Sequence, residues 1–258
     1  MLKAEYITVS GWQAAIRGMR NPKDSWAKSD SLFYSHGHGF DILERPVLWY
    51  NTDSGEEQSD VYIGAKDLEL MCILSDAGDE HAKFMRMINV TMDITAPLYW
   101  WKEFDTYKVG TVANSCSTMH RIHAKEFTMD DFSTEHLYYA PKNILDDVIE
   151  TLNFYREIYN SNKDKEAWWQ MIQLLPSSYN QKRTVQMNYQ VLQRIYHQRK
   201  NHKLDEWHTL CDVIKDLPYA AWIIYECEDQ DNASAQIDRH TQDDTNTGDD
   251  LFLHKRDE

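Results

Sequence analysis

The stretch from Asp93 to His120 constrains the chain most, because its two halves have opposite characters. The first half is bulky and apolar and contains Pro97, Trp100 and Trp101. The second half, from Thr106, is a run of small, hydroxylated and amide side chains. Small side chains let a ligand approach the backbone, and hydroxyls and amides orient it. The stretch therefore predicts either the wall of a binding pocket or an ordinary core helix followed by a polar loop.

The amino-acid composition and net charge favour a folded, acidic protein. The chain has 258 residues, of which 42% are hydrophobic and 12% aromatic, enough for one large domain or two small ones. A formal net charge of -15 argues against binding to nucleic acid or to an anionic membrane. Eleven acidic and three basic residues lie between Glu226 and Glu258, among few apolar side chains. We therefore expect a domain at 1–225 and a disordered acidic tail at 226–258.

Cysteine spacing and the first residues indicate the compartment. The four cysteines are widely separated and form no CxxC pair, which fits a reducing environment. No signal peptide and no apolar run of membrane-spanning length is visible. We expect a soluble cytoplasmic protein of a bacterium, or of a virus that grows in one. His36 and His38 could share a strand face and bind a metal, but no carboxylate or cysteine cluster lies nearby, so we expect no metal site.

Periodicity predicts an α-rich α+β domain with few strands. Alternating residues predict strands at 4–9 and 90–95. Apolar side chains at helical spacing, with turn residues between them, predict helices at 11–20, 65–75, 79–88, 142–159, 165–175, 181–201 and 204–216. Pro97 suits the first turn of the helix that follows the second strand. The candidate N-caps are Ser10, Thr128 or Ser133, and Asp164.

The predicted helix at 181–201 carries polar groups on an otherwise apolar face. The residues of that face follow one another at steps of three and four: Val185, Asn188, Leu192, Ile195, Arg199 and His202. Polar groups buried on such a face need partners, which are supplied by the protein or by a ligand. The face is therefore either one side of an interhelical hydrogen-bond network or half of a binding site.

Two blocks of the sequence, residues 81–120 and residues 174–206, together resemble the flavin-dependent thymidylate synthases. In that family a strand and an A-P-type helix precede an R-H-R motif, which N-x-x-S-x-R-Y follows at close range. Further on come an LLP triplet, a T-x-N or T-x-x-N helix, an arginine and an H-A-Q-x-E-like segment. The equivalent residues here are Ala96-Pro97, Thr106-Tyr107-Lys108, Asn114, Ser117, Met119, His120, Leu174-Leu175-Pro176, Thr184, Asn188, Arg199 and 202–206.

The resemblance implies a fold, a reaction and a set of binding residues. The fold is a small antiparallel sheet with long helices. The reaction transfers a carbon from methylenetetrahydrofolate to C5 of the uracil ring of dUMP, with FAD reduced by NADPH, at sites shared between subunits of a homotetramer. By this resemblance the flavin is bound by Tyr107, Lys108, Asn114, Arg199 and His202. The nucleotide is bound by Glu103, Ser115, Ser117, His120, Asn188 and Gln190.

The sequence departs from the family pattern where the family has cations. Lys108 is the only cation in the first motif, and Met119 and Gln190 stand where the family has arginines. Hydrogen bonds to charged groups contribute about 1.5–3 kcal/mol each, so losing two or three weakens a phosphate ligand by roughly 10³-fold or more. The nearby cations that could take over this role are Arg121, Lys182, Arg183 and Arg194.

These departures leave several functions open. We favour an enzyme similar to flavin-dependent thymidylate synthase that acts on dUMP. A variant that hydroxymethylates the same ring, for a modified viral base, fits the altered motifs. A non-catalytic oligomer that binds a nucleotide or a protein partner on the same fold fits the missing arginines. An unrelated helical interaction protein requires the two-block resemblance to be accidental. Cys116 could add to a pyrimidine ring as a nucleophile, but a small packing residue is the simpler interpretation, so we assign no catalytic residue.

Overall fold

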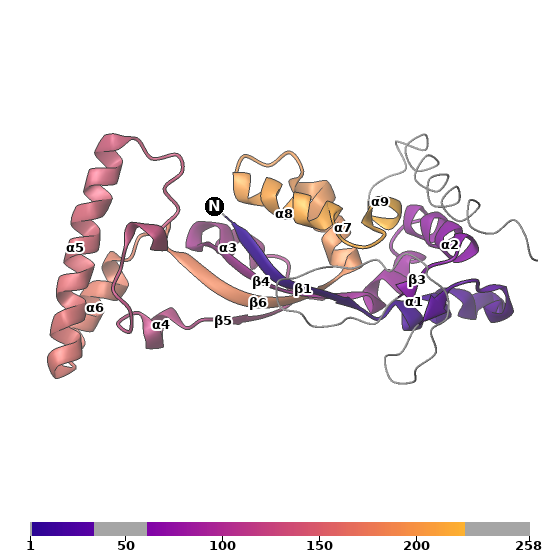
Figure 1. Cartoon of the computed structure of the whole chain (residues 1–258), viewed down its shortest axis with the longest axis horizontal. Coiled ribbons are helices and arrows are strands. Elements are labelled where there is room, and N and C mark those ends of the chain that lie inside the picture. The colour runs from indigo at the N-terminus through magenta and orange to yellow at the C-terminus, as the bar shows by residue number, and fades with distance from the viewer. Residues whose placement is uncertain (1, 34–60, 225–258) are drawn as a thin grey trace, which may run out of the picture.

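A four-stranded antiparallel sheet forms the centre of the molecule. The computed structural model describes residues 2–33 and 61–224, so His36, His38 and the predicted tail at 226–258 lie outside the described ranges. The strand order is β1-β4-β6-β5. The strands run over Lys3–Ser10 (β1), Asn89–Pro97 (β4), Asn180–Asn188 (β6) and Val112–Ser115 (β5). Figure 1 shows an elongated molecule in which the sheet lies between a helical hairpin at one end and α1 and α2 at the other.

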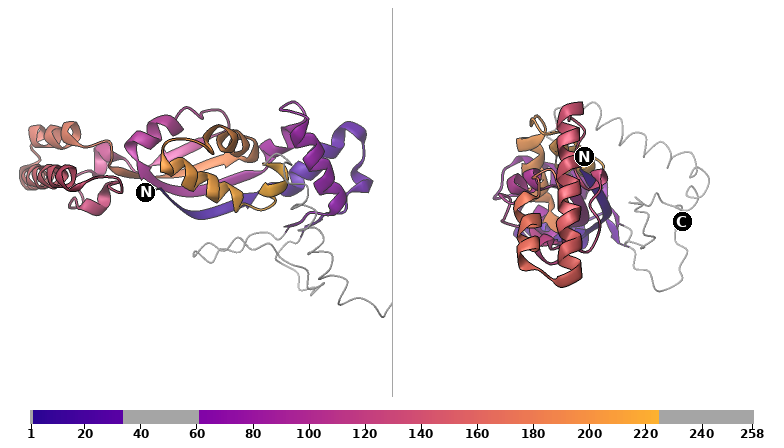
Figure 2. Two further views of the ribbon diagram at one scale, coloured as in Figure 1. Left: turned by 90° about the horizontal axis from the view of Figure 1, so that it is seen from above. Right: turned by 90° about the vertical axis from the view of Figure 1, so that its left-hand side faces the viewer.

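The sheet has one apolar face and one polar face. Along β4, Val90, Met92 and Ile94 are fully buried. The alternate residues Thr91 and Asp93 are only half-buried, as the period of two in a strand requires. The helices that lie over the apolar face are α3 (Leu98–Phe104), α7 (Tyr189–Arg199) and α8 (Asp205–Lys215), as Figure 1 and the left-hand view of Figure 2 show.

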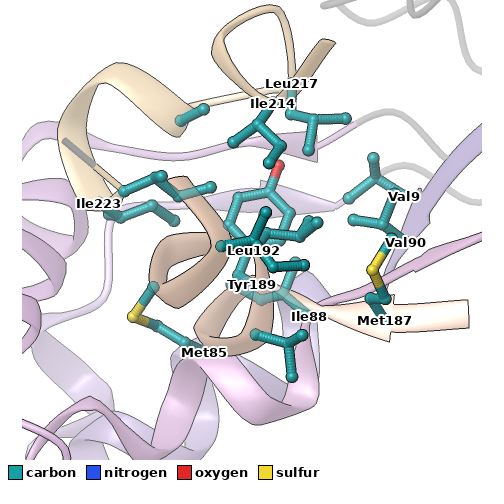
Figure 3. Packing of buried hydrophobic residues seen from close by; sticks show 14 of the residues in the cluster. Val9, Met85, Ile88, Val90, Met187, Tyr189, Leu192, Ile214, Leu217 and Ile223 are labelled. Carbon is teal, nitrogen blue, oxygen red and sulfur yellow. The ribbon is translucent and has the colours of Figure 1, made fainter. Parts of the chain in front are cut away.

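Tyr189, the first residue of α7, lies in the middle of the main core. It is completely buried, and Figure 3 shows Leu192, Ile88 and Met187 around it. Its hydroxyl donates a hydrogen bond to the carbonyl oxygen of Pro218 at 2.7 Å. Burying an aromatic or aliphatic side chain of this size stabilises the fold by about 1.5–3 kcal/mol. Tyr189 therefore fixes the start of α7 on the sheet.

The remaining elements surround this centre. The helix α1 (Trp12–Arg20) and the helix α2 (Ala65–Asp76) pack at one end of the molecule. Shorter elements are η1 (Asn21–Lys23), η2 (Trp26–Lys28), β2 (Leu32–Phe33), β3 (Val61–Tyr62), η3 (Ala82–Met87), α4 (Thr118–Arg121), η4 (Met129–Asp131) and α9 (Ala220–Ile223). No helix in the described ranges is long and apolar enough to cross a membrane.

At the other end of the molecule, α5 (Tyr139–Asn162) and α6 (Lys165–Leu174) form a helical hairpin. This hairpin has a separate hydrophobic core that includes Phe127, Leu152 and Met171. The hydroxyl of Ser133 donates to Oδ1 of Asn180 at 2.9 Å, which ties the base of the hairpin to the first residue of β6.

The helix predicted at 181–201 is wrong in its first half. Residues 180–188 form the strand β6, which pairs with β4 from Asn180 opposite Pro97 to Asn188 opposite Asn89. The helix begins only at Tyr189, and the Asn188 side chain caps it by accepting from the backbone N–H of Val191 at 3.0 Å. The predicted six-residue helical face therefore does not exist, because the ladder of hydrogen bonds with β4 outweighs local helical spacing.

Of the other predictions about single elements, some are confirmed and some are wrong. The strands at 4–9 and 90–95 and the α+β class are confirmed, and so are caps at Thr128 and Asp164. The segment predicted as a helix at 79–88 contains the 3-10 helix η3 instead. Ser10 does not cap α1, because Gly11 takes that position with φ of 95°. Pro97 ends β4 and caps α3 rather than lying in its first turn.

Candidate functional site

Glu103 is the centre of a cluster that joins three helical segments. Its Oε2 atom accepts hydrogen bonds from Arg199 Nη1 at 3.2 Å and from Trp207 Nε1 at 3.0 Å. His202 Nε2 lies 3.3 Å from the same oxygen. Glu103 is in the last turn of α3, Arg199 ends α7, and Trp207 lies in α8. We call these four residues, together with Tyr107, the Glu103 cluster.

Aromatic rings fix the guanidinium group of this cluster. The Arg199 guanidinium carbon lies 4.6 Å from the ring centroid of Trp207 and 5.6 Å from that of Tyr107. Arg199 Nε also donates to the Tyr107 hydroxyl at 2.9 Å. That hydroxyl in turn donates to Oε1 of Gln198 at 2.9 Å. A planar guanidinium held on a ring and by hydrogen bonds to two partners has little freedom to turn.

The Glu103 cluster has a buried floor and an open rim. Trp207 is completely buried, whereas the side chains of Arg199 and His202 are 20% and 22% exposed. The Glu103 side chain is 36% exposed. A ligand at the rim would therefore meet charged and polar groups that rest on an apolar floor, which is the usual composition of a small-molecule site.

A second polar contact lies behind the cluster. The Tyr99 hydroxyl on α3 donates to the Glu206 carboxylate on α8. Burial, together with the neighbouring Glu206 carboxylate, raises the pKa of the Tyr99 hydroxyl well above its ordinary value of 10. The hydroxyl therefore keeps its proton and donates at every physiological pH, so it holds α8 and the floor residue Trp207 against α3.

Asn188 meets the loop after α3 through Gly110. Gly110 has φ of +78°, a conformation that favours glycine. A Cβ atom at this position would lie 2.8 Å from Asn188 Nδ2 and 3.0 Å from Val191 Cγ2. The backbone of the small-residue stretch therefore lies directly against the start of α7, as expected if the two sequence blocks form one site.

Gln190 lies in a different network. It is buried, accepts from Arg86 Nε at 2.5 Å and donates from Nε2 to Asp79 Oδ1 at 3.1 Å. Asp79 also pairs with Arg194. The amide of Gln190 thus has protein partners, and within the described residues no hydrogen bond joins it to the Glu103 cluster.

The remaining predicted residues follow the exposed edge of the sheet. Asn114 and Ser115 lie on β5, opposite Thr184 and Arg183 of β6. The Ser117 hydroxyl caps α4 by accepting from the backbone N–H of His120 at 3.3 Å. Lys108 is exposed in the turn after α3. In the described part of the chain, no hydrogen bond or ion pair joins these residues to the Glu103 cluster.

Three of the four nearby cations already have acidic partners, and one of these, Arg194, pairs with Asp79. Lys182 Nζ lies 3.0 Å from Asp93 Oδ2. Arg183 Nη1 lies 2.7 Å from Asp105 Oδ1, and its guanidinium lies 4.2 Å from the ring centroid of Trp101. These groups are therefore held on the protein itself rather than presented as free anion-binding cations.

Cys116 lies outside the core. It is exposed, its backbone N–H donates to the carbonyl oxygen of Lys182 at 3.0 Å, and its own carbonyl accepts from Gln181 Nε2 at 3.0 Å. The interpretation of Cys116 as a small packing residue is therefore wrong. Within the described ranges no group of three or more histidine, cysteine, aspartate or glutamate side chains is placed to hold a metal ion.

Sequence reasoning assigned no role to Trp207 or Tyr99, and it placed Glu206 only as the last residue of the 202–206 motif. Trp207 lies three residues after Leu204, inside the predicted helix at 204–216, and Glu206 precedes it. An aromatic residue next to an acid in a short amphipathic helix was the available signal. It was not sufficient, because only the packing of α8 on α3 shows which way each side chain points.

Comparison with solved structures identifies the arrangement. One match is the flavin-dependent thymidylate synthase ThyX from Helicobacter pylori, complexed with FAD and dUMP, with a TM-score of 0.58 and 14% identity over 87% of this chain and 98% of that chain. This chain has the thymidylate synthase X fold. A second structure of the Helicobacter pylori enzyme with FAD and dUMP gives a TM-score of 0.57 and 13% identity over 88% of this chain and 98% of that one.

The likeness to thymidylate synthase X confirms the predicted fold and rests on structure alone. No family model matches the chain, and no curated protein matches it. This chain and the Helicobacter pylori enzyme share only 13–14% sequence identity. At that level side-chain roles can differ between two proteins that have the same backbone arrangement.

Proposed function

We propose that this chain binds a uracil nucleotide of the dUMP type at the Glu103 cluster and acts on C5 of its ring. The main support is the contact at 3.2 Å between Glu103 and Arg199, which joins the two motif blocks at a half-open polar site. The two thymidylate synthase X neighbours, both solved with FAD and dUMP, add support from the fold.

The predicted residues then divide into two groups. Arg199, Tyr107 and His202 surround the flat ring, because guanidinium and aromatic faces pack well on heterocycles. The residues on the β5 side, Asn114, Ser115, Ser117 and His120, form no hydrogen bond or ion pair with this cluster within the described protomer. We propose that these residues reach the ligand of a neighbouring protomer in a homotetramer.

Thymidylate synthesis would require FAD, NADPH and methylenetetrahydrofolate as co-reactants. The residues of the Glu103 cluster fit the ring of FAD but not its diphosphate. Arg199 is paired with Glu103, and Met119 and Gln190 carry no charge where the resemblance expects arginines. Two phosphate groups need several charge-assisted hydrogen bonds, each contributing about 1.5–3 kcal/mol. The Glu103 cluster by itself therefore does not fit the whole cofactor.

The test uses the full chain and dUMP labelled with tritium at C5. We expect dUMP binding by calorimetry, and release of tritium to water when FAD, NADPH and methylenetetrahydrofolate are added. Arg199→Ala should abolish dUMP binding. The matched variant Arg194→Ala, on the same helix but paired with Asp79, should retain it. Absence of dUMP binding by the wild-type chain, with and without FAD, would contradict the proposal.

A non-catalytic nucleotide-binding oligomer is the second candidate, and the neutralised Arg199 favours it. A colourless protein that binds dUMP, takes up no FAD and releases no tritium would identify this candidate. A yellow protein with a flavin absorption band and tritium release would identify the enzyme. Mass spectrometry of the product separates methylation from hydroxymethylation of the ring.

A further inference from the structure

Among the described residues, the hydrogen-bond donors to the Glu103 carboxylate reach only one of its two oxygens. Two donors converge on Oε2, namely Arg199 Nη1 at 3.2 Å and Trp207 Nε1 at 3.0 Å, and His202 Nε2 lies 3.3 Å from the same oxygen. No donor from the described ranges reaches Oε1. A carboxylate oxygen accepts hydrogen bonds readily, so Oε1 is a fixed and available acceptor at a side chain that is 36% exposed.

Arg199 has the complementary arrangement. Its Nη1 donates to Glu103 and its Nε donates to the Tyr107 hydroxyl at 2.9 Å. No acceptor within residues 2–33 and 61–224 takes up Nη2. A free acceptor and a free donor therefore belong to one ion pair, which the Trp207 ring holds from below at 4.6 Å.

The ion pair also removes the attraction for anions. A phosphate that approaches Arg199 is attracted by the guanidinium and repelled by the Glu103 carboxylate at nearly the same distance. The attractive and repulsive Coulomb energies therefore largely cancel. To bind the guanidinium fully, an anion would have to displace a carboxylate that accepts hydrogen bonds from both Arg199 and Trp207. The position of Arg199 thus differs from that of an arginine presented freely to phosphate.

We propose that the Glu103–Arg199 pair is a charge-neutral subsite that recognises the edge of a flat pyrimidine-dione ring and rejects anions. A ring N–H donates to Oε1 of Glu103, and the adjacent ring carbonyl accepts from Nη2 of Arg199. The uracil ring and the flavin ring share this edge, so the chemistry applies to both. The ring assignment rests on the proposed function, whereas the rejection of anions rests only on the ion pair.

The first experiment is calorimetry on the wild-type full chain with four probes: 2′-deoxyuridine, N3-methyl-2′-deoxyuridine, riboflavin and inorganic pyrophosphate. We expect 2′-deoxyuridine or riboflavin to bind, and which of them binds identifies the source of the ring. Methylation of N3 removes the donated proton and should weaken the uracil compound at least about tenfold. Pyrophosphate should not compete. Equal binding of the methylated and unmethylated compounds would overturn ring recognition.

The second experiment compares Glu103→Gln with Asp105→Asn. Both remove one acidic charge, but Asp105 pairs with Arg183 rather than Arg199. We expect at least about tenfold tighter pyrophosphate binding by Glu103→Gln and no gain by Asp105→Asn. Equal gains would show a general charge effect and overturn the inference. If Glu103→Gln does not fold, the wild-type chain tests the rejection of anions. A charge-neutral pair requires that pyrophosphate does not compete with the ring compound, so competition would overturn the inference.

The outcomes separate this inference from the proposed function. If neither ring binds but Glu103→Gln gains affinity for pyrophosphate, the proposed function fails and the charge-neutral pair stands. If neither ring binds and no gain appears, both fail.

Discussion

Arg20 on α1 donates from Nε to Oδ1 of Asp67 on α2 at 2.5 Å, with both side chains inside the core. The other oxygen of Asp67 accepts from the hydroxyls of Ser29 and Ser31, each at 2.6 Å. A single carboxylate therefore connects α1, α2 and the segment between them, although it lies far from the candidate site.

Replacing Asp67 by Asn should strongly destabilise the fold. The substitution leaves the buried guanidinium of Arg20 without its counter-ion, and breaking one partner of a buried pair costs about 3–5 kcal/mol. Denaturant unfolding monitored by circular dichroism measures the loss. Asp76→Asn, at the exposed end of the same helix, is the control and should change stability little. Equal stability of the two variants would contradict this role for Asp67.

The lowered pKa of Asp67 predicts that the free energy of unfolding depends on pH in acidic solution. Burial alone would raise the pKa of Asp67, but hydrogen bonds from Ser29, Ser31 and Arg20 outweigh burial and hold it below its ordinary value of 3.8. The stabilisation is therefore present above that ordinary value and disappears as the pH falls through the lower folded-state pKa. The free energy of unfolding, measured against pH below about 4, should fall less steeply in Asp67→Asn than in the wild type.

Removing the Tyr99 hydroxyl should loosen α8. Tyr99→Phe leaves the buried carboxylate of Glu206 without this donor, at a cost of about 1–3 kcal/mol. The melting temperature measures the effect, and Tyr138→Phe, whose side chain is 85% exposed, is the matched control. An unchanged melting temperature in Tyr99→Phe would show that Glu206 needs no partner there.

Gly110 and Gly78 form a matched pair for the contact between the loop and α7. Both have positive φ, +78° and +97°, but a Cβ at Gly78 meets nothing within 4 Å. Gly78→Ala should therefore show backbone strain alone, about 1 kcal/mol. Gly110→Ala adds a collision with Asn188 and should cost more in the same unfolding assay. Ligand binding should also weaken only in Gly110→Ala.

The cysteines should differ in reactivity toward a thiol reagent. Cys116 is exposed, whereas burial raises the pKa of the Cys211 thiol to about 11 and shields it. In a Cys227→Ala background, the fast phase of labelling of the folded protein should disappear when Cys116 is replaced by Ala. Unchanged tritium release from dUMP by Cys116→Ala would exclude Cys116 as a nucleophile, and a fast phase that persists would place the reactive thiol elsewhere.

Local patterns predicted the elements whose stability is local. The helices expected at 65–75, 142–159, 165–175 and 204–216 match α2, α5, α6 and α8 closely. Their apolar side chains recur at helical spacing because each helix buries one face. In contrast, β6 has four consecutive half-buried polar residues at its start, so its sequence shows no alternation there. Its extended form depends on hydrogen bonds to β4 and β5.

The sequence by itself determined the fold class, the position of the small-residue stretch and the order of the two motif blocks, because these depend on residue type and spacing along the chain. Only the tertiary structure decided how the charges are used. It placed Glu103 against Arg199, Gln190 against Arg86, and Trp207 beneath the guanidinium. Electrostatic contacts depend on distance in space, and Glu103 and Arg199 lie 96 residues apart in the chain, as Arg86 and Gln190 lie 104 apart.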